Sequence, residues 1–176
     1  MCSSDLLTGH GLSGHAIGSD LQRVKTDFTK AVDLGTGIKD NAYLWCNLGQ
    51  VQMELGEVDT AYKNLSRAIE LDTDFSEARS HRAFLLANTS TLGSKTLAQA
   101  KEDTRRAFDS KEPRSYWDYR AAAAVNAAFG DFQRAIKFQS LAEDAIRKTG
   151  PKRFVVIASQ ERSRYEQMAD KVKPSK

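Results

Sequence analysis

Residues 42–75 of the chain read AYLWCNLGQVQMELGEVDTAYKNLSRAIELDTDF, and this stretch decides the fold. Its apolar residues recur mostly at steps of three and four on both sides of Gly56, which is the period of an amphipathic helix rather than the alternation of a strand. Glycine accepts the left-handed backbone conformation that commonly ends a helix, so we expect Gly56 to end the first helix and begin a turn. The stretch therefore predicts two helices joined by a tight turn.

Large and small residues stand at fixed places within this hairpin. In order, they are Trp45, Leu48, Gly49, Ala61, Leu65 and Ala68. The pattern resembles the tetratricopeptide repeat (TPR), a helical hairpin of about 34 residues. Small residues suit the places where two helix backbones cross at roughly 8 to 10 Å. The resemblance implies an all-α fold, a right-handed α-α superhelix (TPR solenoid), and it also suggests the C-terminal part of a bacterial TPR protein.

The landmarks of this hairpin recur along the chain, as they must if neighbouring hairpins are to bury a continuous core. The alanine pair and the turn glycine return as Ala100 and Ala107, Ala135 and Ala142, and Gly130. We therefore expect about three hairpins, preceded by half a repeat and followed by a cap. The predicted units are a half-repeat at 21–38, repeats at 42–75, 76–114 (with a lengthened loop at 88–96) and 116–150, and a capping helix at 152–172.

The capping helix is predicted because one of its sides is apolar and the other is charged. A repeat array must end in an element whose outer face is polar. Charged residues provide that face here, and those expected to point outward are Arg153, Glu161, Arg162, Arg164, Glu166, Asp170 and Lys171.

Residues 1–20 are rich in Gly, Ser and His and lack periodicity, so we expect a disordered or non-native segment there. Met1–Leu6 resembles the translated end of a sequencing adapter. Leu21–Leu34 resembles the second helix of a repeat whose first helix is missing or degenerate. The hypothesis is that the chain is the C-terminal piece of a longer protein, and residues 21–176 form its TPR-like domain.

Composition narrows the function classes. The 176 residues carry a formal net charge of +3 with charges of mixed sign, which favours nucleic acid only weakly. No apolar run is long enough to suggest a membrane span. Cys2 and Cys46 have no paired spacing, so the sequence suggests neither a disulfide framework nor a zinc site, and a reducing, cytoplasmic location is expected. No metal or other cofactor is predicted.

The resemblance implies a binding groove on the concave face, lined mainly by the first helix of each hairpin. Exposed aromatic residues beside amides and one arginine would suit an extended peptide, although each aromatic could instead pack between adjacent hairpins. The candidate groove residues are Tyr43, Cys46, Asn47, Gln50, Met53, Glu77, Ser80, His81, Phe84, Trp117 and Arg120, with Ala124 and Ala127 beside them.

The sequence thus predicts a scaffold that binds a protein or peptide partner in this groove and has no catalysis of its own. Cys46 could be read as a nucleophile and His81 as an acid or base, but a buried thiol and a polar helix residue are the commoner cases. One alternative is a helical-repeat RNA-binding module, for which a basic groove would be expected. A second is a regulatory TPR tail of a larger signalling enzyme such as a bacterial protein kinase.

Overall fold

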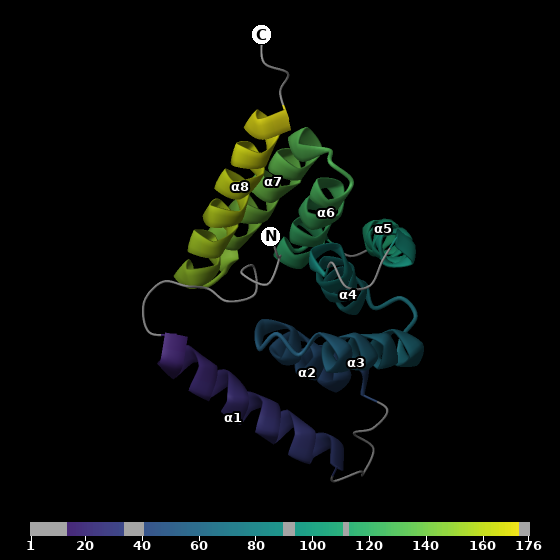
Figure 1. The fold of residues 1–176 in the computed structure, drawn as a ribbon. Helices are drawn as coiled ribbons and strands as arrows, with labels where there is room; N and C mark the ends of the chain where they lie inside the picture. The colour runs from purple at the N-terminus through teal and green to yellow at the C-terminus, as the bar shows by residue number, and fades with distance from the viewer. Residues whose placement is uncertain (1–13, 34–40, 90–93, 111–112, 173–176) are drawn as a thin grey trace.

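The computed structural model describes residues 14–33, 41–89, 94–110 and 113–172, and within these ranges it contains eight helices and no strand (Figure 1). The all-α prediction is confirmed for this part of the chain. The helices are α1 (Gly14–Asp33), α2 (Ala42–Glu54), α3 (Val58–Leu71), α4 (Ser76–Asn88), α5 (Ser94–Asp109), α6 (Tyr116–Ala128), α7 (Phe132–Thr149) and α8 (Lys152–Val172).

Each helix packs against the next one along the chain, so chain order is followed in space from α1 to α8 (Figure 1). The pairs α2 with α3, α4 with α5, and α6 with α7 form hairpins. Helix α4 also packs on α2 and, more extensively, on α6, which brings the first helices of successive hairpins side by side. One cluster of buried apolar residues joins α2 to α6, and two further clusters lie between α6, α7 and α8.

The α2–α3 hairpin shows why a small residue is needed at Gly49. A Cβ atom placed on Gly49 would lie 2.7 Å from Leu65 Cγ and 3.2 Å from the Leu65 backbone nitrogen. These distances are shorter than ordinary van der Waals contacts, so the two backbones approach too closely for a larger side chain. At the turn that follows, Gly56 has φ +77°, and Gly130 has φ +81° at the corresponding place between α6 and α7. Both turns use the left-handed conformation that glycine adopts readily.

The repeated alanines lie at the helix crossings. All six are buried, with exposed fractions of 3% or less: Ala61, Ala68, Ala100, Ala107, Ala135 and Ala142. They come from α3, α5 and α7, the second helices of the three hairpins. The second helices therefore pack through matched small residues in each hairpin, as the sequence period indicates.

The second hairpin has Arg79 and Arg82 at the places where the first has Trp45 and Leu48. Arg79 and Arg82 of α4 both bond to Asp103 of α5, which is fully buried. The nitrogen–oxygen distances are 3.3 Å from Arg79 Nη1, and 2.8 and 2.9 Å from Arg82 Nε and Nη2. This buried ion cluster joins α4 to α5 at the place where α2 meets α3 through Gly49.

Two predicted boundaries differ from the structure. Helix α1 begins at Gly14, so residues 14–20 are helical rather than disordered, while residues 1–13 lie outside the described residues. Helix α5 begins at Ser94, so residues 94–96 of the loop predicted at 88–96 are helical. Glycine and serine have low helix propensity, so the local sequence alone does not predict a helix. Packing of α1 on α2 compensates for this low propensity.

Helix α8 has the predicted bounds but one of its charges points inward. Glu161 is buried and accepts hydrogen bonds from Arg120 of α6 and from Gln139 of α7. The expectation that Glu161 belongs to the solvent-facing side is therefore wrong. A carboxylate is stable inside the protein here because a guanidinium and an amide satisfy its oxygens.

Candidate functional site

The first helix of repeat one presents three of the predicted groove residues at the surface. Tyr43 is 63% exposed, and its ring lies 4.6 Å from that of Phe75. Asn47 is exposed, and Gln50 is half-buried and donates a hydrogen bond to Glu54 across 3.4 Å. These side chains are available to a partner.

Five other predicted groove residues are buried between hairpins: Cys46, Met53, Ser80, His81 and Phe84. Ser80 donates to Asp118 of α6 across 2.5 Å, and the His81 ring lies 4.6 Å from that of Trp117. The expectation that these five line an open groove is not met, because α2, α4 and α6 pack against one another on this side. Their side chains contribute to packing between neighbouring hairpins.

The remaining three candidates divide between surface and core. The Glu77 side chain is 40% exposed, and its Oε1 lies 3.6 Å from His81 Nε2. This interaction lowers the pKa of Glu77, although partial burial opposes the shift. Trp117 is half-buried. Arg120 is held inside the protein and is not available to a partner.

Arg120 joins three helices. Its guanidinium donates to both carboxylate oxygens of Glu161, at 2.6 and 3.0 Å, and lies 3.9 Å from the centre of the Phe84 ring. Burial would lower the pKa of Arg120, but the adjacent Glu161 carboxylate outweighs burial and raises it. The ion pair therefore ties α8 to α6 over the aromatic ring of α4.

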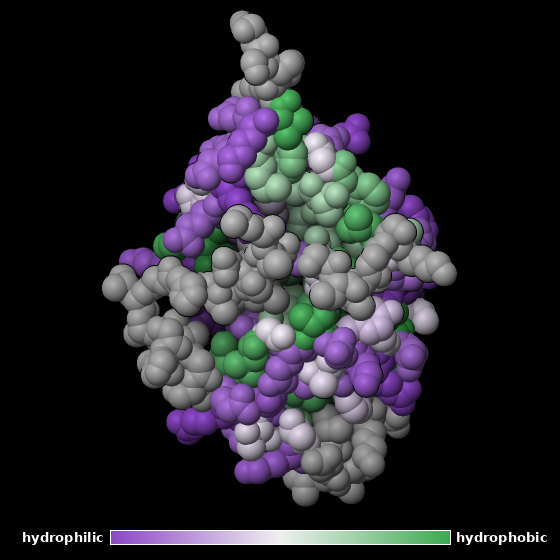
Figure 2. Space-filling view, viewed as in Figure 1, coloured by the Kyte–Doolittle hydropathy of each residue, from purple (hydrophilic) through white to green (hydrophobic). Residues whose placement is uncertain are grey.

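A cleft of about 400 Å³ lies between α1, α2 and the first turn of α8. Figure 2 shows an apolar area between α1 and α2 with polar surface beside it. We call this the α1–α2–α8 cleft. Its apolar residues are Leu21, Val24, Phe28 and Val51, and its polar residues are Asp20, Asn47, Gln50, Glu54 and Arg153.

The cleft joins parts of the sequence that are far apart. Asn47 and Gln50 were predicted to line a groove, but the opposing wall comes from α1 and its end from Arg153 of α8. The spacing of Leu21, Val24 and Phe28 indicates an apolar helix stripe, yet nothing local shows that the stripe faces polar residues of α2. Only the packing of α1 and α8 around α2 reveals this.

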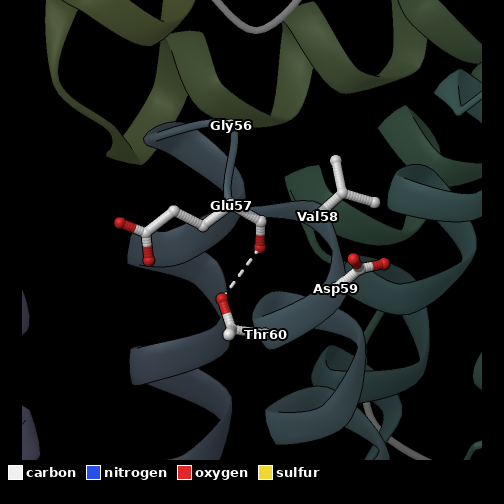
Figure 3. Close-up of a pocket in the computed structure, with 5 residues that line it drawn as sticks. All are labelled: Gly56, Glu57, Val58, Asp59 and Thr60. Carbon is white, nitrogen blue, oxygen red and sulfur yellow. Dashed lines mark hydrogen bonds between the residues drawn. The ribbon is translucent and has the colours of Figure 1, made fainter.

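A second hollow lies at the start of α3 and is lined by residues 56–60 (Figure 3). In it the Thr60 hydroxyl donates to the Glu57 carbonyl oxygen across 3.1 Å, and the side chains of Glu57 and Asp59 point to opposite sides. The start of a helix favours anions, but these two carboxylates already supply negative charge. Glu57 is also paired with Lys25 of α1 at 2.6 Å. The hollow is therefore a poor candidate for a binding site.

Two observations limit the chemistry of the described residues. No group of three or more His, Cys, Asp or Glu side chains in this part of the chain is arranged to hold a metal ion. None of the helices that the structure describes is both long enough and apolar enough to cross a membrane.

Comparison with protein-family models gives no match for this chain, and comparison with curated protein sequences gives none either. The likeness to the TPR pattern therefore rests on the residues of the chain itself, such as Trp45, Gly49 and the repeated alanines.

Proposed function

We propose that this protein is a TPR-type helical-repeat module that binds a segment of another polypeptide in the α1–α2–α8 cleft. The observation that carries the proposal is the composition of the cleft, in which an apolar stripe on α1 faces polar side chains of α2. Peptide-binding sites commonly combine these two features, because apolar pockets hold side chains while amides bond to the peptide backbone.

The exposure of single residues supports this reading. Val24 stays 40% exposed although α1 packs on α2, so apolar surface remains for a partner to cover. Beside it, the Asn47 side chain is exposed and makes no hydrogen bond to another described residue. Such an amide can donate and accept at once, as an extended peptide backbone requires.

The candidate catalytic residues fit a binding module better than an enzyme. Burial raises the pKa of the Cys46 thiol, and the nearby Glu77 carboxylate adds to the rise, so the sulfur stays protonated and weakly nucleophilic. His81 is 1% exposed and packed against Trp117, which leaves a substrate no direct access to its ring.

The proposal can be tested by selecting binders from a displayed library of random peptides with the full chain as bait. We expect selected peptides to lose at least tenfold in affinity when Val24→Asp or Asn47→Arg changes the cleft, since each adds a charge where the peptide is in contact. Val172→Asp is the matched control, because Val172 is an exposed valine on α8 that does not line the cleft.

Thermal melting of each variant shows whether it remains folded. Selected peptides that bind all variants equally would contradict the proposal. Tight and salt-sensitive binding of a random RNA pool, with no cleft-dependent peptide selected, would favour the RNA-binding alternative instead.

A further inference from the structure

We infer that Arg153 sets the specificity of the α1–α2–α8 cleft, which selects a peptide carrying an acidic residue close to its apolar anchor. This inference rests on the proposed function and names the chemistry of the partner. Among the described residues that line the cleft, Arg153 carries the only positive charge.

The Arg153 side chain is exposed and packs on the aromatic ring of its neighbour Phe154. Its guanidinium carbon lies 4.7 Å from the centre of the Phe154 ring, and that ring in turn lies 5.6 Å from the ring of Trp117. A cation above an aromatic face is attracted by the ring and loses little hydrogen-bonding capacity, because the guanidinium donors point outward in its own plane. The exposed guanidinium therefore keeps donors that a partner can reach.

Two less exposed arginines of the protein combine an aromatic ring with a carboxylate, whereas the exposed Arg114, 5.0 Å from the centre of the Phe108 ring, donates to the Phe108 carbonyl oxygen. Arg82 and Arg120 each contact an aromatic ring and a carboxylate together: Arg82 with Tyr62 and Asp103, and Arg120 with Phe84 and Glu161. Arg153 has the ring, but within the described residues no carboxylate oxygen lies within ion-pair distance of it. A carboxylate from a partner would complete the same arrangement.

The surroundings favour an acid at the α8 end of the cleft. The first turn of α8 contains Lys152 and Arg153 and no acidic residue, and the helix dipole adds positive potential there. The carboxylates in the cleft come from α1 and α2, and Glu54 accepts a hydrogen bond from Gln50. The lining thus holds two carboxylates and one guanidinium, and an acidic side chain of a partner can pair within it only with Arg153.

The experiment repeats the peptide selection with the full chain carrying Arg153→Glu. Wild-type protein is expected to enrich an acidic residue at one position beside an apolar residue. Such peptides should bind Arg153→Glu at least tenfold more weakly, in line with the loss of a charge-assisted contact. Selection on Arg153→Glu should enrich a basic residue at that position. Lys171→Glu is the control, because it makes the same charge change at an exposed site on α8 outside the cleft.

The outcomes separate this inference from the proposed function. The selected peptides could depend on Val24 and Asn47 without being enriched in acidic residues, or could be enriched in basic residues that pair with Asp20 and Glu54. Either result overturns the inference and leaves the proposed function intact. If no selected peptide depends on Val24 or Asn47, both are overturned. Unchanged binding of acidic peptides to Arg153→Glu, with melting unchanged, also overturns the inference.

Discussion

The first two hairpins of the molecule are both pairs of consecutive packed helices, but they are held together by different contacts. In α2–α3, Gly49 lets the backbones approach until a Cβ would clash with Leu65. In α4–α5, Arg82 and Arg79 instead both bond to the buried Asp103. The comparison teaches that hairpin geometry depends on filling the interhelical space, and that close apolar packing and a satisfied ion cluster can both do so.

The two kinds of contact should differ in how much stability is lost when one of their residues is substituted. An apolar contact weakens in proportion to the volume removed. A buried ion cluster loses much more when one partner goes, because the charges left behind are neither solvated nor paired. Arg79 adds to this dependence, since it also donates to the Thr73 carbonyl oxygen at 2.6 Å and so holds the chain between α3 and α4.

The largest expected effect comes from Asp103→Ala, which leaves the guanidinium groups of Arg79 and Arg82 without their shared carboxylate. We expect the free energy of unfolding to fall by about 3 to 5 kcal/mol, measured by urea denaturation. Asp109→Ala is the control, because Asp109 lies on the same helix but pairs with Arg105 in solvent. It should cost about 1 kcal/mol or less. Equal losses for the two variants would show that the cluster is not essential to the second hairpin.

Gly49→Ala tests the other side of the comparison and should have a smaller effect. Alanine is favoured over glycine inside a helix by about 1 kcal/mol, but here its Cβ would meet Leu65. We expect a net loss of about 1 kcal/mol or more in urea denaturation, since overpacking a core costs about 1 to 3 kcal/mol. In a Leu65→Ala background the same change should become stabilising. A gain in the wild-type background would mean that the backbones can separate without cost.

The smallest expected effect concerns Glu77, near the contact of the two hairpins. Its pKa in the folded protein lies below the ordinary value of 4.5, so its contribution to stability is present above that value and is lost as the pH falls through the folded pKa. Wild type should therefore be slightly more stable than Glu77→Gln at pH 7, by well under 1 kcal/mol because the side chain is partly exposed. The difference should shrink as the pH falls below about 4.5. A difference that grows in acid would reverse the assigned sign.

The helical hairpins could be predicted from the sequence because their signals are local. The period of apolar residues, the turn glycines and the repeated alanines each lie within one or two helices. The ion cluster could not be predicted in the same way, since Asp103 is 24 positions from Arg79 and 21 from Arg82. From the sequence alone, both arginines are departures from the repeat pattern. A charged residue in a helix usually faces solvent, so nothing local indicates that these two meet a buried carboxylate.

The candidate site was predictable only on its α2 side. Asn47 and Gln50 follow from their places on the first helix of a complete hairpin. Val24 and Arg153 were not foreseen in the cleft, because they are 129 positions apart by their residue numbers and meet only once the helices have packed. His81 and Phe84 occupy groove places in the repeat pattern, but contacts with Trp117 and Arg120 bury them.

The burial of Cys46 between α2 and α4 makes this thiol a natural reporter of local opening. A thiol reagent can reach the sulfur only during moments when these helices separate, so the labelling rate under native conditions measures the opening equilibrium of that one contact. With Cys2 replaced by serine, the kinetics would follow a single site. The opening of one interface could then be compared with unfolding of the whole chain without introducing a new reporter residue.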